Sequence, residues 1–261
     1  PPSSRSRDRA RGGRRGAGMT GPRPASASPR GRAHGPGGPA GAVALVAARD
    51  EEGRVGDAVR ALRALPHVAE VVVVADGCQD RTAEEAREAG AKVLVPPCPL
   101  GKGRALEGAL ERLAPAPVYL LVDADTGESA GEAARLLAPV LAGELDCAVG
   151  ALPPGGGGFG LVRALARLAV RRLTGVELAS ALSGQRALTS AALQAARPLA
   201  PGYGLETAMA VDLLRLGFRV GEVPVRMRHR ATGRDLRGFA HRARQALDVL
   251  RAVAPRAVGL R

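Results

Sequence analysis

Two aspartates, Asp123 and Asp125, are the residues of this chain whose type and spacing most clearly allow chemistry. They follow an apolar run, 118–122, which predicts a buried strand. Side chains two positions apart on an extended chain point the same way, so both carboxylates can face one ligand. Hard oxygen donors suit a divalent cation, and such a cation commonly bridges to phosphate oxygens. The alternative for an isolated pair is a solvated loop, and the rest of the chain has to decide between the two.

The elements that must position these acids alternate between strands and helices. Apolar runs predict strands at 42–48, 71–74, 92–95 and 118–122. Apolar residues at helical spacing predict helices between them, at 55–65, 83–89 and 104–113. This alternation predicts an α/β fold with a doubly wound, mostly parallel sheet, whose strand ends at one edge form the ligand site. Beyond 125 we expect helices at 131–138, 161–173, 190–196, 205–216 and 235–253, strands at 147–150 and 218–225, and a turn or short strand at 183–186.

The net charge of +13 belongs to the two ends of the chain. Residues 1–40 contain nine Arg and one Asp, and residues 226–261 contain ten Arg and two Asp, whereas the middle has slightly more acids than bases. A nucleic-acid partner for the core therefore has no electrostatic support. Basic ends indicate an anionic surface such as lipid head groups.

Composition also predicts three segments. Residues 1–40 lack large apolar side chains and are expected to form a disordered basic arm. Residues 41–230 form the α/β domain, and 231–261 a basic amphipathic helix that either docks on the domain or lies on anionic lipid. Three cysteines without metal-site spacing fit a reducing compartment. No apolar run approaches the roughly 18 residues of a membrane span, so we expect a cytoplasmic protein, peripheral on the inner face of the membrane.

Further polar clusters stand near the ends of other predicted strands. Acidic residues 50–52 follow the first strand, and residues 76–80 follow the second. Lys102, one of two lysines, lies between glycines where a helix begins. Backbone N–H groups, a helix N-terminus and an ammonium group could together hold a diphosphate, although the P-loop pattern is absent. Several such turns at one sheet edge predict a polar, metal-dependent ligand site.

These clusters follow one another in a recognisable order, and two later segments complete the series. The segments are Arg49-Asp50-Glu51-Glu52, Asp76-Gly77-Cys78-Gln79-Asp80, Gly101-Lys102-Gly103, Asp123-Ala124-Asp125, Ser183-Gly184-Gln185-Arg186-Ala187, Gly202-Tyr203-Gly204-Leu205-Glu206 and Glu222-Val223-Pro224-Val225. Their order and spacing resemble the family 2-type glycosyltransferases of the GT-A fold, over about residues 43–230. The resemblance implies transfer of a sugar from a UDP- or GDP-sugar, a nucleotide-diphosphate donor, to a hydroxyl or phosphate acceptor such as polyprenyl phosphate.

The resemblance also implies a role for each residue of the site. Asp125 and His229 would hold Mg²⁺ or Mn²⁺, with Asp123 beside them on the metal or the ribose, and Glu206 would act as the general base. The donor would be bound by Asp50, Glu52, Asp76, Lys102 and Asp123. The acceptor would be bound by Ser183, Gly184, Tyr203 and Arg230.

The sequence departs from the family pattern at three places and leaves alternatives open. Asp50 stands where the family has Asn, Ala75 where it has Asp, and Gln185 where it has an aromatic residue. Residues 202–206 also resemble glucosyl-3-phosphoglycerate synthases, which retain anomeric configuration, and in that case Glu206 would bind the acceptor. The alternative classes are a non-catalytic nucleotide-sugar or nucleic-acid binding module and a nucleotidyltransferase. The acidic turn after the first strand counts against the nucleotidyltransferase, and a dehydrogenase is disfavoured because no G-x-G-x-x-G follows that strand.

Overall fold

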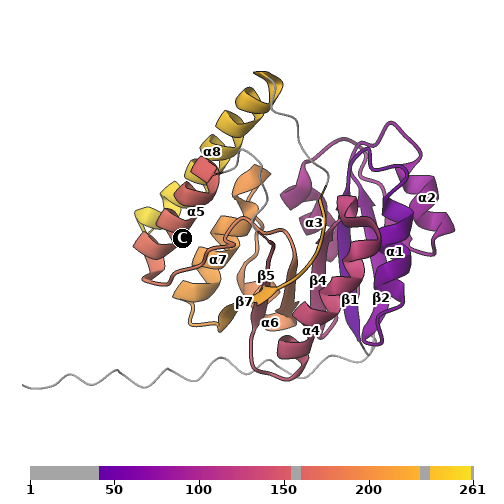
Figure 1. The fold of residues 1–261 in the computed structure, drawn as a ribbon, viewed down its shortest axis with the longest axis horizontal. Coiled ribbons are helices and arrows are strands. Elements are labelled where there is room, and N and C mark those ends of the chain that lie inside the picture. Colours follow the sequence, from indigo (N-terminus) through magenta and orange to yellow (C-terminus); the bar gives the residue numbers. More distant parts are fainter. Residues whose placement is uncertain (1–40, 154–159, 230–235, 260–261) are drawn as a thin grey trace, which may run out of the picture.

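A seven-stranded sheet organises the part of the chain that the computed structural model describes, residues 41–153, 160–229 and 236–259 (Figure 1). Within 236–243 only the backbone is described, and the predicted arm at 1–40 lies outside these ranges. The strand order is β3-β2-β1-β4-β6-β5-β7. The strands are β1 Ala42–Ala48, β2 Val68–Ala75, β3 Lys92–Leu94, β4 Val118–Asp123, β5 Cys147–Ala151, β6 Arg186–Thr189 and β7 Val220–Pro224.

The pairing of the strands confirms the predicted doubly wound, mostly parallel sheet. β1 lies between β2 and β4 and is parallel to both, β3 is parallel to β2, and β7 is parallel to β5. β6 is antiparallel to its neighbours β4 and β5, which the sequence did not predict. Because β6 runs the other way, it begins at the edge where β4 ends, with Arg186 opposite Leu121.

Helices cover both faces of the sheet, as the alternating side chains of the strands require. In β1, Ala44 and Val46 face one hydrophobic core, while Val43 and Leu45 face the other. The first core is covered by α1 Val55–Arg63, α2 Thr82–Glu88, the 3₁₀ segment η1 Ala124–Ala133 and α4 Ala134–Leu141. The second is covered by α3 Lys102–Leu110, α6 Ser190–Ala195 and α7 Leu205–Arg215, which follows the 3₁₀ turn η2 Gly202–Gly204.

The helix predicted at 131–138 differs from the structure. The chain after β4 forms η1, with a kink at Gly127 (φ 52°, ψ −141°), and α4 begins only at Ala134. The apolar residues Leu136, Leu137 and Val140 are buried and set the inward face of α4. Small and polar residues precede them, so the regular helix starts later than predicted.

The last helix, α8 Leu236–Ala257, packs on the domain beside α5 Gly160–Thr174 (Figure 1). Val249 and Val253 are buried with Val162 of α5. Arg256 of α8, which is 3% exposed, pairs with the buried Asp212 of α7. Of the two expectations for this segment, docking on the domain is therefore the one observed for the inner face of α8. No helix in the described ranges is long and apolar enough to cross a membrane.

Candidate active site

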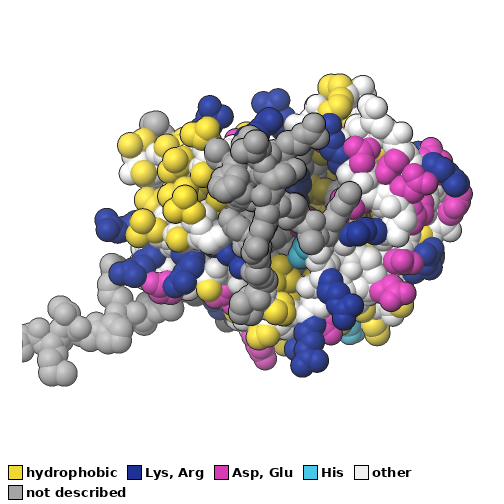
Figure 2. All heavy atoms as spheres, turned by 45° about the horizontal axis from the view of Figure 1, so that its top comes forward, with side chains coloured by type: hydrophobic (Ala, Val, Ile, Leu, Met, Phe, Trp, Pro, Cys, Tyr) yellow, Lys and Arg dark blue, Asp and Glu magenta, His cyan; other side chains and the backbone are white. Residues whose placement is uncertain are grey.

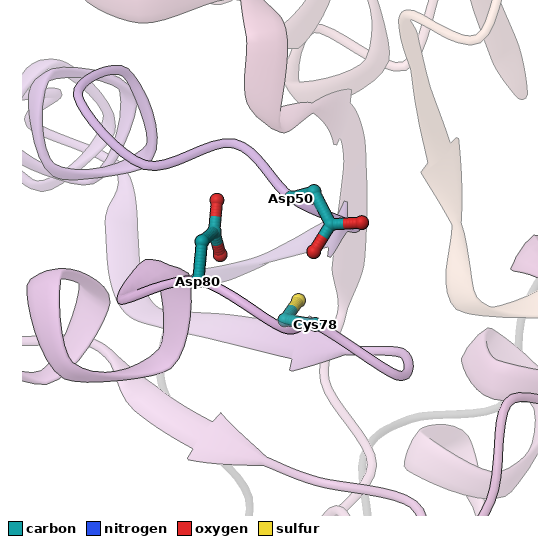
Figure 3. A group of neighbouring side chains, drawn as sticks. All are labelled: Asp50, Cys78 and Asp80. Carbon is teal, nitrogen blue, oxygen red and sulfur yellow. The ribbon is translucent and has the colours of Figure 1, made fainter.

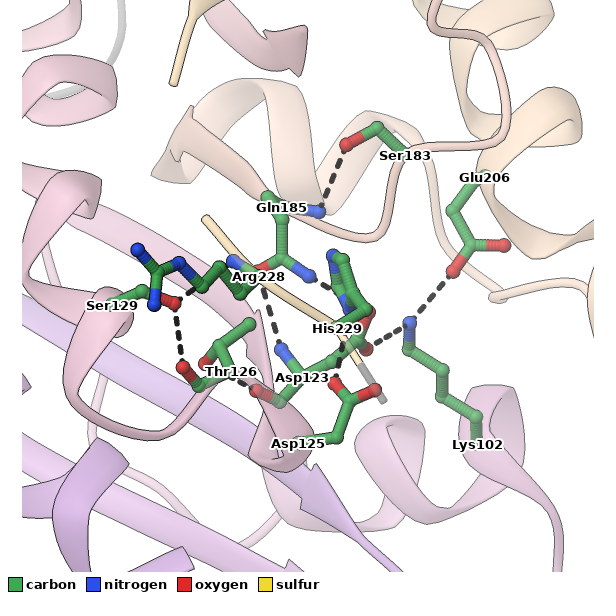
Figure 4. A network of polar contacts seen from close by, with 10 residues as sticks. All are labelled: Lys102, Asp123, Asp125, Thr126, Ser129, Ser183, Gln185, Glu206, Arg228 and His229. Atoms are coloured by element: carbon green, nitrogen blue, oxygen red, sulfur yellow. Dashed lines mark hydrogen bonds and ion pairs between the residues drawn. The ribbon is translucent and has the colours of Figure 1, made fainter. Parts of the chain in front are cut away.

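Asp123 lies at the centre of a polar network where β4 ends and β6 begins (Figure 4). Its Oδ1 accepts a hydrogen bond from Lys102 Nζ at 2.7 Å, and its Oδ2 accepts one from Gln185 Nε2 at 2.8 Å. The backbone N–H of Asp123 donates to Gln185 Oε1 at 3.3 Å. Gln185 is fully buried and precedes β6, so the antiparallel strand brings it directly to Asp123.

Lys102 joins two acids that lie far apart in the sequence. It occupies the first turn of α3, and its ammonium group contacts Asp123 and, at 2.8 Å, Oε1 of Glu206 in the first turn of α7. Burial by itself would lower the pKa of Lys102, but the charges of Asp123 and Glu206 outweigh it and raise that pKa. Burial would likewise raise the pKa of Asp123, but the charge and hydrogen bond of Lys102 lower it. Lys102 is therefore a cation held between two carboxylates.

Two glycines allow this close packing. A Cβ on Gly184 would lie 2.5 Å from Oδ2 of Asp123 and 2.7 Å from Nζ of Lys102. A Cβ on Gly103 would lie 2.2 Å from the carbonyl oxygen of Ala200. Gly184 therefore gives Asp123 and Lys102 the space to meet, and Gly103 lets α3 approach the segment that leads into α7.

Asp125 and His229 form the other half of the site. His229 Nδ1 lies 3.0 Å from Asp125 Oδ1. The hydrogen bond to Asp125 raises the pKa of His229; burial opposes this, and the charges of Asp125 and Asp123 add to it. One ligand atom each from Asp123, Asp125 and His229 lies within 4.8 Å of the others.

Hydrogen bonds between hydroxyl groups and the backbone fix the position of the segment that carries His229. Thr126 Oγ1 donates to the carbonyl of Asp123 at 2.8 Å, and Ser129 Oγ donates to the carbonyl of Thr126 at 2.6 Å. The N–H of Arg228 in turn donates to Ser129 Oγ at 2.9 Å. The bond between Arg228 and Ser129 thus connects the segment after β7 to η1, one residue before His229 (Figure 4).

Asp123, Asp125 and His229 fit a divalent cation. Carboxylate oxygens are the ligands that Mg²⁺ and Mn²⁺ prefer, and Mn²⁺ also accepts an imidazole nitrogen. Two carboxylates and one imidazole converge within a span that a single ion can bridge. The positive charge of Lys102 stands beside them, so the site combines metal ligands with a fixed cation.

Of the acids predicted to bind the donor, Asp123 belongs to this network, whereas Asp50, Glu52 and Asp76 lie outside it. Asp76 is 5% exposed, and its two carboxylate oxygens accept the N–H groups of Leu100 and Gly101, each at 2.7 Å. It therefore shapes the loop that leads into α3. Glu52 accepts the N–H of Arg81 at 3.2 Å and so connects the turn after β1 with the start of α2.

Asp50 belongs to a second polar group, with Cys78 and Asp80 (Figure 3). Its backbone has φ 53°, and its Oδ1 accepts the N–H of Gln79 at 2.7 Å. Asp80 accepts the N–H of Glu52 at 3.0 Å. These bonds connect the turns after β1 and β2, next to the site on the same edge of the sheet.

Three of the four residues predicted to bind the acceptor lie in the described part of the chain. Ser183 and Gly184 lie in the loop before β6, where Ser183 Oγ accepts the N–H of Gln185 at 3.4 Å. Tyr203 is 41% exposed, and burial raises its pKa, with the charge of Glu206 adding a smaller contribution. Arg230 lies outside the described residues.

Sequence reasoning did not assign a role to Gln185, Thr126 or Ser129. Gln185 could have been noticed because it replaces the aromatic residue of the family pattern. The replacement puts a polar amide at a buried position. Thr126 and Ser129 gave no signal, because their partners lie in the backbone.

Comparison with known proteins identifies the family. The profile of the family described as "Glycosyl transferase family 2" matches residues 44–180. The chain therefore belongs to the family 2 glycosyltransferases, and its fold is the GT-A fold. The expected enzyme class, a glycosyltransferase, is confirmed.

Individual relatives agree with this assignment. Glycosyltransferase AglJ of Haloferax volcanii is 32% identical over 181 residues, which cover 64% of this chain and 56% of AglJ. The chain thus spans little more than half the length of that relative. Glucosyl-3-phosphoglycerate synthase of Mycobacterium tuberculosis, solved with Mn²⁺, UDP and glucosyl-3-phosphoglycerate, is 25% identical with a TM-score of 0.70, covering 82% of this chain and 80% of the other. A structure of the same synthase with Mg²⁺ and UDP is 26% identical, also with a TM-score of 0.70, and covers 82% and 79% of the two chains.

Proposed function

We propose that this glycosyltransferase is metal-dependent and moves a sugar from a nucleotide-diphosphate donor, UDP- or GDP-linked, to a phosphorylated acceptor. The observation that carries the proposal is the convergence of Asp123, Asp125 and His229 beside Lys102. Binding of UDP with Mn²⁺ or Mg²⁺ by the mycobacterial synthase supports the same donor chemistry here.

In this proposal the metal is Mg²⁺ or Mn²⁺, held by Asp125 and His229 with Asp123 beside them. When bound, the ion would offset the negative charge of the diphosphate leaving group. Lys102 places a second positive charge 2.7 Å from Asp123, and its ammonium protons are directed by the two carboxylates. Asp50, Glu52 and Asp76, in the turns that frame the same sheet edge, are proposed to contact the base and ribose.

Glu206 faces the acceptor side of the proposed reaction. If the acceptor is attacked through a hydroxyl group with inversion, Glu206 is the proposed general base. The alternative is a retaining reaction, in which Glu206 binds the acceptor instead. Its ion pair with Lys102 and its 8% exposure support a fixed position for the carboxylate in both cases. Ser183, Gly184, Tyr203 and Arg230 are proposed to complete the acceptor subsite.

We consider two acceptor classes, one suggested by a relative and one by the composition of this chain. The mycobacterial synthase was solved with UDP-glucose and phosphoglyceric acid, which supports a small phosphorylated acid. The feature of this chain that favours a polyprenyl phosphate is its basic C-terminal segment, which suits an anionic lipid surface. For a lipid-borne acceptor we propose peripheral contact with an anionic membrane.

A donor screen tests the proposal. UDP- and GDP-sugars are incubated with Mn²⁺ or Mg²⁺, and released UDP or GDP is measured with polyprenyl phosphate or 3-phosphoglycerate as acceptor. We expect one donor to be turned over, chelation by EDTA to stop the reaction, and one acceptor to raise the rate. Binding of donor without release or transfer would instead identify a non-catalytic module and overturn the proposal.

A further inference from the structure

The outer faces of α5 and α8 carry large apolar side chains that nothing in the described chain covers. Leu161 and Leu168 of α5 are 81% and 48% exposed. Leu247 and Leu250 of α8 are each 50% exposed, and Val258, which follows that helix, is 70% exposed. We call these five residues the apolar strip. Figure 2 shows hydrophobic side chains gathered over this part of the molecule.

Helical spacing places the strip residues of α5 and of α8 on one side of each helix. Leu161 and Leu168 are seven residues apart, and Leu247 and Leu250 are three apart, so each pair lies along one side of its helix. Between the helices, Leu165 and Ala246 are partly buried in the cluster around Val249. On each helix, apolar side chains therefore continue from the shared core, through partly buried positions, to the exposed residues of the strip.

Arginines flank the strip on the outer sides of both helices. On α5, Arg167 and Arg171 are exposed, one turn apart from each other and next to Leu168. On α8, Arg244 and Arg251 are exposed next to Leu247 and Leu250. The sequence of α5 contains no acidic residue, and the nearest acid, Glu177, is paired with Arg167 and Arg171. In Figure 2 most acidic side chains gather at the opposite end of the molecule.

We propose that the strip and its arginines form a surface that docks on an anionic lipid bilayer. Apolar side chains enter the boundary between head groups and acyl chains, while flanking arginines contact lipid phosphates, as on amphipathic interfacial helices. A second copy of this chain is the less suitable partner, because it would bring two arginine rims together, and like charges oppose association.

The surface serves the proposed function by bringing the site to a lipid-borne acceptor, and to that extent its purpose rests on the proposed function. Vesicle binding, however, requires neither donor nor acceptor. The two ideas therefore fail separately: donor turnover tests the reaction, and vesicle binding tests the surface.

The experiment is co-sedimentation of the full chain with vesicles of phosphatidylcholine, with or without phosphatidylglycerol. The test variant is Leu247→Glu with Leu250→Glu. The matched control is Leu141→Glu on α4, which adds the same kind of charge at a 43% exposed leucine away from the strip. Circular dichroism melts and donor hydrolysis establish that each variant is folded and that its active site is intact.

We expect the wild type and Leu141→Glu to bind phosphatidylglycerol vesicles at least tenfold more tightly than the double variant, with binding weakened by salt. Absence of wild-type binding would overturn the proposal. Equal binding of the double variant would also overturn it, since the basic arm at 1–40 would then account for the attachment. A wild-type dimer that the double variant converts to a monomer, without vesicle binding by either, would show that the strip joins two copies and would overturn the lipid surface.

Discussion

Replacement of Gly184 by alanine tests whether the packing around Asp123 is essential for activity. The new Cβ would lie 2.5 Å from Asp123 Oδ2, whereas ordinary contact begins near 3.4 Å, so the two atoms must separate by about 0.9 Å. The carbon would also lie 2.7 Å from Lys102 Nζ, so both groups are displaced together. The backbone itself accepts alanine, because Gly184 does not occupy the left-handed region.

The size of the effect follows from that displacement. A shift of about 1 Å in a catalytic group can cost on the order of 100-fold in rate, or roughly 2.7 kcal/mol of transition-state stabilisation. Overpacking lowers the free energy of unfolding by about 1–3 kcal/mol. We therefore expect Gly184→Ala to remain folded at 25 °C and to lose most of its turnover.

The assay is nucleotide release from the best donor with Mn²⁺, with thermal unfolding followed by circular dichroism because the chain contains no Trp. Gly108→Ala is the matched control, since a Cβ at this position of α3 meets no atom within 4 Å. Near-wild-type turnover by Gly184→Ala would refute the reasoning. A loss of activity that only follows the unfolded fraction would refute it as well.

Three further predictions concern the rest of the domain. Gly108→Ala should raise the free energy of unfolding by about 0.5–1 kcal/mol in urea titration, because glycine is unfavourable inside a helix; a loss of stability would contradict this. Arg256→Met should lower the free energy of unfolding by about 3–5 kcal/mol, because Asp212 would be left buried without its partner. Adding Asp212→Leu in the same chain should recover part of this loss. A loss below about 1 kcal/mol for Arg256→Met would show that the ion pair contributes little. Burial raises the pKa of Cys147 to about 11, so in native protein at pH 8 iodoacetamide should modify the exposed Cys98 and leave Cys147 intact. Peptide mass spectrometry checks this, and equal labelling of both thiols before unfolding would be inconsistent with the buried position of Cys147.

Much of the fold was predictable because local pattern and tertiary structure agree. The apolar run 42–48 forms β1 with the predicted bounds, and helical spacing at 161–173 corresponds to α5. β6 was harder to predict, since four residues show no periodicity and their direction depends on pairing with β4 and β5. That direction matters, because it is what brings Gln185 to Asp123.

The sequence predicted which polar segments gather at this sheet edge, but it did not predict the contacts between their side chains. The sequence placed Lys102 and Asp123 at the same sheet edge, yet the contact of Lys102 with Glu206 spans 104 positions and depends on how α7 packs. Asp76 illustrates the opposite case. The family resemblance implied a donor contact for Asp76, whereas in the structure both of its carboxylate oxygens accept backbone N–H groups of the loop before α3. Spacing cannot distinguish an acid that binds a ligand from one that shapes a loop, and the donor role of Asp76 stays a prediction.

The most direct test of the proposed function is calorimetric titration of UDP into the protein with and without Mn²⁺. The comparison is between the wild type and Asp125→Ala, both checked for folding by circular dichroism. We predict that Mn²⁺ tightens UDP binding by the wild type at least tenfold and that Asp125→Ala loses this enhancement. UDP binding that is indifferent to Mn²⁺ in the wild type, or an undiminished enhancement in Asp125→Ala, would contradict the assignment of the metal site.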